Sequence, residues 1–151
     1  MGTLRVLNLL LGAVLVGGMI MEVALILPTL RRLSGEATVR ALQIMGPIAW
    51  RYLPVCGVGS TLAAIGTIVL EPRFGDAVVQ LTTGGVVTSM TGMAVNLTLY
   101  LPLEREMRAW SPEAPPAELP AALARVTRIH TARTALFGLG FACYVVAAVL
   151  A

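Results

Sequence analysis

Four long apolar segments set the strongest limit on how this chain can fold. They run from about Val6 to Leu27, Tyr52 to Leu70, Ala77 to Leu101 and His130 to Ala151. Each is near the ~20 residues that a helix needs to cross the hydrocarbon core of a bilayer. Because lipid offers the backbone no hydrogen-bond partners, uninterrupted runs of this length favour helices. We therefore predict an all-α, integral membrane four-helix bundle that forms one domain over residues 1–151.

The composition excludes several other classes of protein. Hydrophobic residues make up 57% of the chain and charged residues only 13%, whereas about a quarter of the residues in a soluble domain are charged. A water-soluble enzyme, a disordered chain and a disulfide scaffold are excluded. The basic residues are all arginines without a clustered patch, and only 5% of the residues are aromatic, so a nucleic-acid partner is not expected. Cys56 and Cys143 lie in apolar runs, which is typical of buried free thiols.

The connections between the segments differ in length. The link from Arg31 to Arg51 predicts a short amphipathic helix over Glu36–Met45, ended by Gly46-Pro47, that lies on the membrane surface. A polar turn, Glu71–Asp76, joins the second and third segments. The third link, from Glu104 to about Leu119, is a proline-rich loop, after which Pro120 suits the first turn of a long last helix.

The distribution of arginine predicts the orientation of the chain. The two long links and their flanks carry most of the arginines: Arg31, Arg32, Arg40, Arg51, Arg105, Arg108, Arg125 and Arg128. The opposite side has only Arg5 and Arg73. Positive residues favour the cytoplasmic side, so we expect a multi-pass protein of the cell membrane with both termini outside the cytoplasm.

Four polar residues interrupt the apolar segments near one end of the bundle. They are Glu22, Asn96, His130 and Arg133. Glu22 and Asn96 each lie six positions before a proline, which is about 9 Å at 1.5 Å per residue. His130 and Arg133 open the fourth segment from the same side. Such residues are costly in a membrane and are functional candidates by default, so we predict that they share one layer and act as catalytic residues.

Small residues predict which helix faces surround this layer. Gly18 precedes Glu22 by one turn, and Thr88 and Gly92 continue the stripe of Asn96 at a spacing of four. Small residues allow close helix approach. We therefore predict a polar pocket between the first, third and fourth helices, open toward the cytoplasmic leaflet, with Thr88 and Gly92 among its substrate-binding residues.

Three residues at the start of the second span are predicted to line the rim of this pocket and to bind substrate. They are Trp50, Arg51 and Tyr52. Aromatic residues are also enriched where helices meet the membrane interface. Trp50 and Tyr52 have this second interpretation as interfacial anchors.

Two interpretations of the polar layer stay open at this point. The four residues can form a catalytic pocket, or a Glu22–Arg133 ion pair with Asn96 and His130 can lock the bundle of a non-catalytic subunit or scaffold. A transporter ranks third, because no inverted repeat is evident.

No metal site and no cofactor are predicted from the residues. A chain with a single histidine cannot supply two histidine ligands to a haem. Two copies that share His130 would supply them, so a shared metal or haem stays an alternative. Homo-oligomers are one expectation for the chain, because small residues cover more than one face of the third helix: Gly84, Gly85, Thr88, Ser89 and Gly92.

Two short motifs resemble a known membrane family. The segment Ala94–Leu99 contains an asparagine near the end of the third helix, and Arg128–Arg133 contains an H-x-x-R pattern that opens the fourth. With Gly17-Gly18, Glu22 and Pro28 in the first helix, this pattern resembles the DUF1772 / anthrone oxygenase-like family over almost the whole chain. Members with an assigned role oxidise polyketide anthrones to anthraquinones with dioxygen.

The resemblance implies roles for the four polar residues. His130 or Glu22 would be the base that removes a proton from an activated methylene group. Arg133 and Asn96 would stabilise the oxyanion that forms. The substrate would be a lipophilic aromatic, anthrone- or quinone-like molecule that enters from the lipid bilayer, and the reaction would be an oxygenation by a membrane oxidoreductase.

Overall fold

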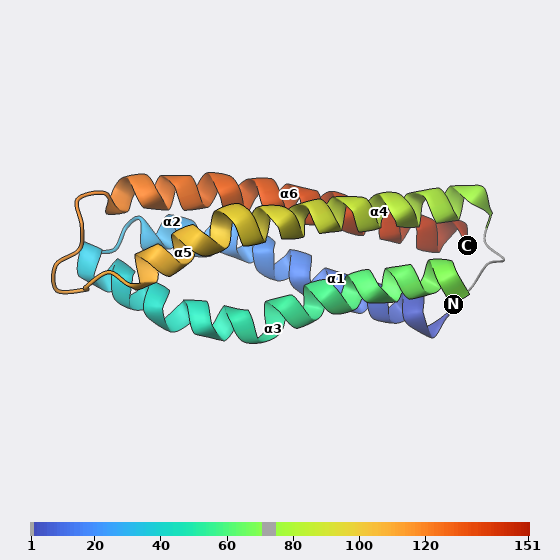
Figure 1. Ribbon diagram of the computed structural model, residues 1–151, viewed down its shortest axis with the longest axis horizontal. Helices are drawn as coiled ribbons and strands as arrows, with labels where there is room; N and C mark the ends of the chain where they lie inside the picture. Colours follow the sequence, from blue (N-terminus) through green and yellow to red (C-terminus); the bar gives the residue numbers. More distant parts are fainter. Residues whose placement is uncertain (1, 71–74) are drawn as a thin grey trace.

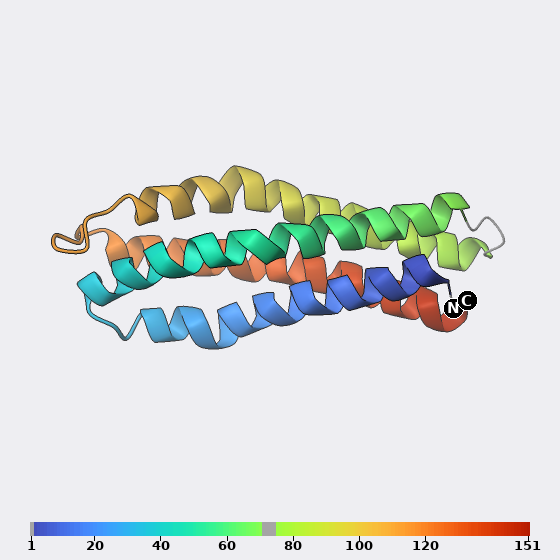
Figure 2. The ribbon, with the colours of Figure 1, turned by 90° about the horizontal axis from the view of Figure 1, so that it is seen from below.

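Four long helical segments lie side by side and form one elongated bundle (Figure 1; Figure 2). The computed structural model describes residues 2–70 and 75–151, and these residues contain helices and connecting turns but no strands. Four segments are long and apolar enough to cross a membrane: Thr3–Leu30, Gly35–Leu70, Ala77–Arg108 and Leu119–Leu150. The predicted helical bundle is confirmed, and its architecture is that of a membrane protein.

The spans are built from eight elements in chain order. The first contains α1 (Thr3–Met21), the π-helical turn η1 (Glu22–Ile26) and α2 (Leu27–Leu30), and the second is α3 (Gly35–Leu70). The third contains α4 (Asp76–Val95), the π-helical turn η2 (Asn96–Tyr100) and α5 (Leu101–Arg108), and the fourth is α6 (Leu119–Leu150). Both termini lie at one end of the bundle. We call the opposite end, with connections 31–34 and 109–118, the loop end.

The first and third spans carry the same irregularity at the same place. The N–H of Leu27 donates to the carbonyl of Glu22, five residues back, and the N–H of Leu101 donates to that of Asn96. The next residue in each span is a proline. A proline inside a helix lacks an N–H and its ring crowds the carbonyl four residues back, and a widened turn before it accommodates that crowding. Glu22 and Asn96 therefore each begin a π turn, a feature frequently found at functional sites.

The predicted separate surface helix over Glu36–Met45 is wrong. Gly46-Pro47 does not end the helix, because α3 runs from Gly35 to Leu70 with Pro47 and Pro54 inside it. A proline bends a helix instead of ending it when packing holds the helical segments on both sides of the proline. Figure 1 accordingly shows α3 bent rather than straight.

Tertiary contacts pack the start of α3 against the rest of the bundle. The side chains of Thr38 and Val39 are almost fully buried, and the Thr38 hydroxyl donates to the carbonyl of Leu30 at 3.0 Å. The amide of Gln43 donates to the carbonyls of Arg108 and Trp110. These contacts tie α3 to the ends of α2 and α5.

The other predicted connections have different outcomes. Residues 71–74 of the predicted turn Glu71–Asp76, including Arg73, lie outside the described residues. The last helix begins at Leu119 with Pro120 in its first turn, as predicted. The orientation across the membrane stays a prediction.

Two apolar clusters form the core, one on each side of the polar layer. The cluster nearer the bundle centre contains Leu15, Val16, Met19, Cys56 and Phe137. The cluster at the loop end contains Leu27, Leu30, Leu103, Met107, Leu119, Leu123 and Val126. Glu22 lies between Met19 and Leu27 along the chain, so the polar layer separates the two clusters.

Helices α4 and α6 approach each other closely through glycines. A methyl group added at Gly85 would overlap the Tyr144 ring and lie 2.9 Å from the carbonyl oxygen of Gly140. A methyl group at Gly140 would lie 2.7 Å from the hydroxyl of Ser89. This part of the small-residue stripe on α4 therefore packs against α6 of the same chain.

We expect Gly85→Ala to lower the free energy of unfolding by about 1–3 kcal/mol, because overpacking forces tightly packed groups apart. Gly84→Ala is the matched control, since nothing lies within 4 Å of a methyl group placed there. Chemical unfolding of the detergent-solubilised protein, followed by circular dichroism, measures both. Equal stability of the two variants would contradict the close approach of α4 and α6.

Candidate functional site

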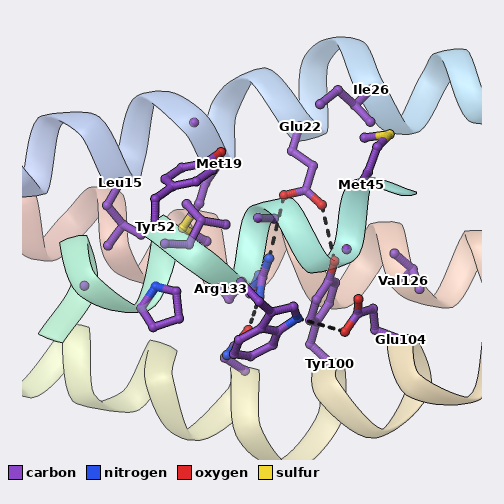
Figure 3. Close-up of a pocket in the computed structure, with 18 of the residues that line it drawn as sticks. Leu15, Met19, Glu22, Ile26, Met45, Tyr52, Tyr100, Glu104, Val126 and Arg133 are labelled. Atoms are coloured by element: carbon purple, nitrogen blue, oxygen red, sulfur yellow. Dashed lines mark hydrogen bonds and ion pairs between the residues drawn. The ribbon is translucent and has the colours of Figure 1, made fainter. Parts of the chain in front are cut away.

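The four polar residues predicted to share a layer contact one another in the structure, and Figure 3 shows two of them, Glu22 and Arg133, beside a pocket. Glu22 and Asn96 begin the two π turns, and His130 and Arg133 lie one turn apart on α6. Arg133 donates through Nη1 to Asn96 Oδ1 and through Nε to His130 Nδ1, the latter at 3.0 Å. The second guanidinium nitrogen, Nη2, lies 3.8 Å from Glu22 Oε2. Three spans thus meet at one guanidinium group.

The hydrogen bonds of His130 determine which of its ring nitrogens carries a proton. Nδ1 accepts from Arg133, so its lone pair is occupied. The proton of a neutral imidazole is then on the other nitrogen, Nε2. Nε2 lies 3.2 Å from Glu22 Oε2 and 3.4 Å from the Met19 carbonyl. The Nε2–H therefore donates to the Met19 carbonyl, with the Glu22 carboxylate 3.2 Å from the same nitrogen.

Tyr100 belongs to the same cluster, although the sequence analysis did not include it. Its hydroxyl donates to Glu22 Oε1 at 3.3 Å, and the Arg133 guanidinium lies 3.7 Å from the centre of its ring. A cation over an aromatic face is attracted by the ring electrons. The signal in the sequence was an aromatic residue one helical turn after Asn96.

Glu104 is a second carboxylate that the sequence analysis placed in a loop. It is 6% exposed, and its Oε2 accepts a hydrogen bond from Trp50 Nε1 at 3.0 Å. Its Oε1 lies 3.3 Å from Arg108 Nη1. The third span continues beyond Pro102, so that Glu104 lies eight residues after Asn96 on the same helical segment. Eight residues are about two helical turns, which brings the two residues to one face.

A cavity of about 520 Å³ lies beside these residues, between all four spans. Small-molecule sites usually have volumes of about 300–1,000 Å³. Glu22, Asn96, Tyr100, Glu104 and Arg133 are its polar lining residues, together with Trp50 and Tyr52. Apolar side chains lie on both sides of them: Leu15, Met19, Leu53, Met93 and Phe137 toward the bundle centre, and Ile26, Leu42, Met45, Met107 and Val126 toward the loop end. The cavity is therefore mostly apolar, with polar groups in the middle of its length.

The cavity also borders the outer surface of the bundle beside α3. Met21, Ile48 and Tyr52 line it and are each about half exposed. In a membrane, this surface faces lipid. Pro54, one of the two prolines inside α3, is also a lining residue.

Not every residue predicted for substrate binding reaches the cavity. Trp50 and Tyr52 line it, whereas Arg51, Thr88 and Gly92 do not. The Thr88 hydroxyl donates to carbonyls of its own helix. A methyl group at Gly92 would lie 3.0 Å from the Phe137 ring. The small-residue stripe packs helices together instead of lining a binding surface.

His130 also differs from the expectation of a residue in contact with substrate. It is 0% exposed and does not line the cavity. Glu22 and Arg133, which both contact His130, line the cavity. Within residues 2–70 and 75–151, no group of three or more histidine, cysteine, aspartate or glutamate side chains is placed to hold a metal ion.

Comparisons of the chain with protein-family models, with curated proteins and with solved structures gave no match.

Proposed function

We propose that the protein is a membrane-embedded enzyme that binds a lipophilic aromatic molecule, anthrone- or quinone-like, and oxidises it with dioxygen. The observation that carries this proposal is a carboxylate, Glu22, at the wall of a mostly apolar cavity, backed by His130 and Arg133. An apolar cavity with a few convergent polar groups is the usual form of a small-molecule site. The resemblance to the DUF1772 / anthrone oxygenase-like family supports the same activity.

Glu22 is the group best placed to act as the base. Its carboxylate lines the cavity, and one of its oxygens faces His130 Nε2 at 3.2 Å. It would take one proton from the methylene carbon of the substrate and leave the electron pair delocalised onto the carbonyl oxygen. A positioned base of this kind contributes about 10²–10⁴-fold to a rate.

Asn96 supports the proposal through its unused hydrogen-bond donors. Its Oδ1 accepts from Arg133, while no bond from its amide nitrogen to a described residue accompanies that contact. This nitrogen can donate to the oxyanion that forms when the substrate loses a proton. Arg133 adds positive charge beside the same place.

The overall reaction balances without a further reactant. The electron-rich anion reduces dioxygen; one oxygen atom becomes the new carbonyl oxygen of the anthraquinone. The other oxygen atom leaves as water with the two hydrogens of the methylene group. A planar apolar substrate would reach the site from the bilayer, past the exposed lining residues beside α3.

The test is conversion of anthrone to anthraquinone by the purified protein in lipid nanodiscs, with dioxygen consumption measured in parallel. We expect one dioxygen per anthrone, and a decrease in turnover of about a hundredfold in Glu22→Gln. The control is Glu36→Gln, which makes the same change at an exposed carboxylate of the loop end. Wild-type protein that does no more than match the spontaneous oxidation, or a folded Glu22→Gln variant with full turnover, would overturn the proposal.

A second candidate function is favoured by the contacts of Arg133. This side chain joins α6 to η1 and η2 through Glu22, Asn96 and Tyr100. The same contacts would stabilise a small non-catalytic membrane subunit. Such a protein would show no turnover of anthrone, with or without Glu22.

A further inference from the structure

Glu104 is a buried carboxylate that the proposed reaction does not use. It lines the cavity at the loop end, beside Leu42, Met45 and Met107. A methyl group added at Gly46 would lie 2.5 Å from Glu104 Oε1. The carboxylate therefore occupies a close-fitting place between α3 and α5 and does not extend into water.

The hydrogen bonds of Glu104 leave part of its capacity unused. A carboxylate accepts about four hydrogen bonds. The described residues supply two donors, Trp50 Nε1 to Oε2 and Arg108 Nη1 to Oε1. The nearby donors of the cavity are directed at protein acceptors, since Trp50 donates to Glu104 and Tyr100 donates to Glu22. This end of the cavity thus presents acceptors to a ligand.

Glu104 is also set apart from the reacting groups along the cavity. It follows Asn96 by eight residues, which is about 12 Å of helical rise. An elongated multi-ring molecule that reaches Glu22 and Asn96 with one group would face Glu104 with another. Because apolar side chains surround Glu104, the part of the ligand beside it must be aromatic or aliphatic except for the group that the carboxylate binds.

We infer that Glu104 accepts a hydrogen bond from a hydroxyl group on the ligand, and that the cavity thereby selects hydroxylated aromatic molecules over equivalents without a donor. This inference rests on the proposed function, since it names the substrate class of the same cavity. Hydrogen bonds to a charged acceptor are about twice as strong as neutral ones, which makes selection by a single hydroxyl group effective.

The experiment compares two fluorescent probes, 2-hydroxyanthracene, which has an O–H donor, and 2-methoxyanthracene, in which a methyl group replaces that hydrogen. Binding to the wild-type protein in phosphatidylcholine nanodiscs is measured by probe fluorescence, and partition into empty nanodiscs is subtracted. We expect the hydroxyl probe to bind about tenfold more tightly or better. This comparison needs no variant, so it does not depend on whether a substitution folds.

Two variants assign the selection to Glu104. Glu104→Gln keeps the size of the side chain and an oxygen for Trp50, but it loses the charge, so the preference for the hydroxyl probe is expected to fall to about twofold or less. Trp50→Phe removes the indole donor and leaves the carboxylate, so the preference is expected to persist. If the Trp50–Glu104 contact were purely structural, both variants would lose stability alike. Each would then keep the wild-type ratio of the two probe affinities.

The outcomes separate this inference from the proposed function. If both probes bind the wild-type protein equally, or if folded Glu104→Gln keeps the full preference, the inference is wrong while the aromatic site stands. If neither probe binds above its partition into empty nanodiscs, the proposed function fails together with the inference. A Trp50→Phe variant that loses the preference as completely as Glu104→Gln would also overturn the role assigned to Glu104.

Discussion

Arg133→Leu is expected to lower the free energy of unfolding by about 3–5 kcal/mol, the usual effect of removing one partner of a buried charged pair. Arg133 is 6% exposed, and it contacts His130, Asn96 and Glu22 through its nitrogens. Leucine would leave the Glu22 carboxylate without its nearest positive charge and the Asn96 oxygen without its donor.

The measurement is unfolding of the detergent-solubilised protein, followed by the loss of helical circular dichroism. Arg125→Leu is the control, because Arg125 is exposed on the same helix and an exposed substitution usually changes stability by less than about 0.5 kcal/mol. If Arg133→Leu were as stable as Arg125→Leu, the contacts of Arg133 would not hold the bundle together.

The double variant Glu22→Leu/Arg133→Leu separates the two candidate functions. Replacing a whole buried ion pair by apolar residues is often neutral or stabilising, so the double variant is expected to be more stable than Arg133→Leu alone. If the layer is catalytic, this variant folds but does not turn over anthrone. If the layer is only a structural lock, the wild-type protein has no turnover to lose.

Gly18→Leu is expected to abolish ligand binding and turnover together, because the added side chain would protrude into the cavity and overlap a bound multi-ring ligand. Gly18 lines the cavity, and the nearest atoms to a methyl group placed there are the Leu53 side chain at 3.8 Å and the Tyr52 hydroxyl at 4.0 Å. A leucine therefore has room to enter without displacing backbone. A ligand cannot bind where the leucine side chain already lies, whatever polar groups the ligand carries.

The neighbouring residue provides a matched control for this change. Gly17 is exposed on the outside of the same helix, and nothing lies within 4 Å of a methyl group added there. Gly17→Leu makes the same change in helix propensity and hydrophobicity, but the side chain points away from the cavity. Binding of 2-hydroxyanthracene in nanodiscs is expected to persist in Gly17→Leu and to fall below detection in Gly18→Leu. Intact binding in both variants would show that this cavity is not the ligand site.

Local spacing was sufficient to predict much of the bundle and of the polar layer. The helices follow from the length of the apolar runs, because lipid requires a backbone that satisfies its own hydrogen bonds. The common depth of Glu22 and Asn96 follows from the equal distance of each to its proline. Both properties depend on residues close together in the chain.

The continuation of helices past prolines could not be predicted in the same way. Gly46-Pro47 and Pro102 are local signals for a helix end, yet α3 and α5 extend through them. Contacts with distant residues decide the outcome, as the bonds from Gln43 to the carbonyls of Arg108 and Trp110 show. Glu104 was assigned to a loop for this reason.

The membrane-length helices and the common depth of four polar residues follow from the amino-acid sequence. Helical rise per residue and the need of a backbone in lipid to satisfy its own hydrogen bonds are both local properties. Which residues meet around the cavity depends instead on the tertiary structure. Tyr100 and Glu104 line the cavity. Four predicted site residues do not line it: Arg51, Thr88, Gly92 and the fully buried His130. The physical reason is that the rotation and bending of helices, set here by two π turns and a proline-bent α3, depend on packing between spans far apart in the chain.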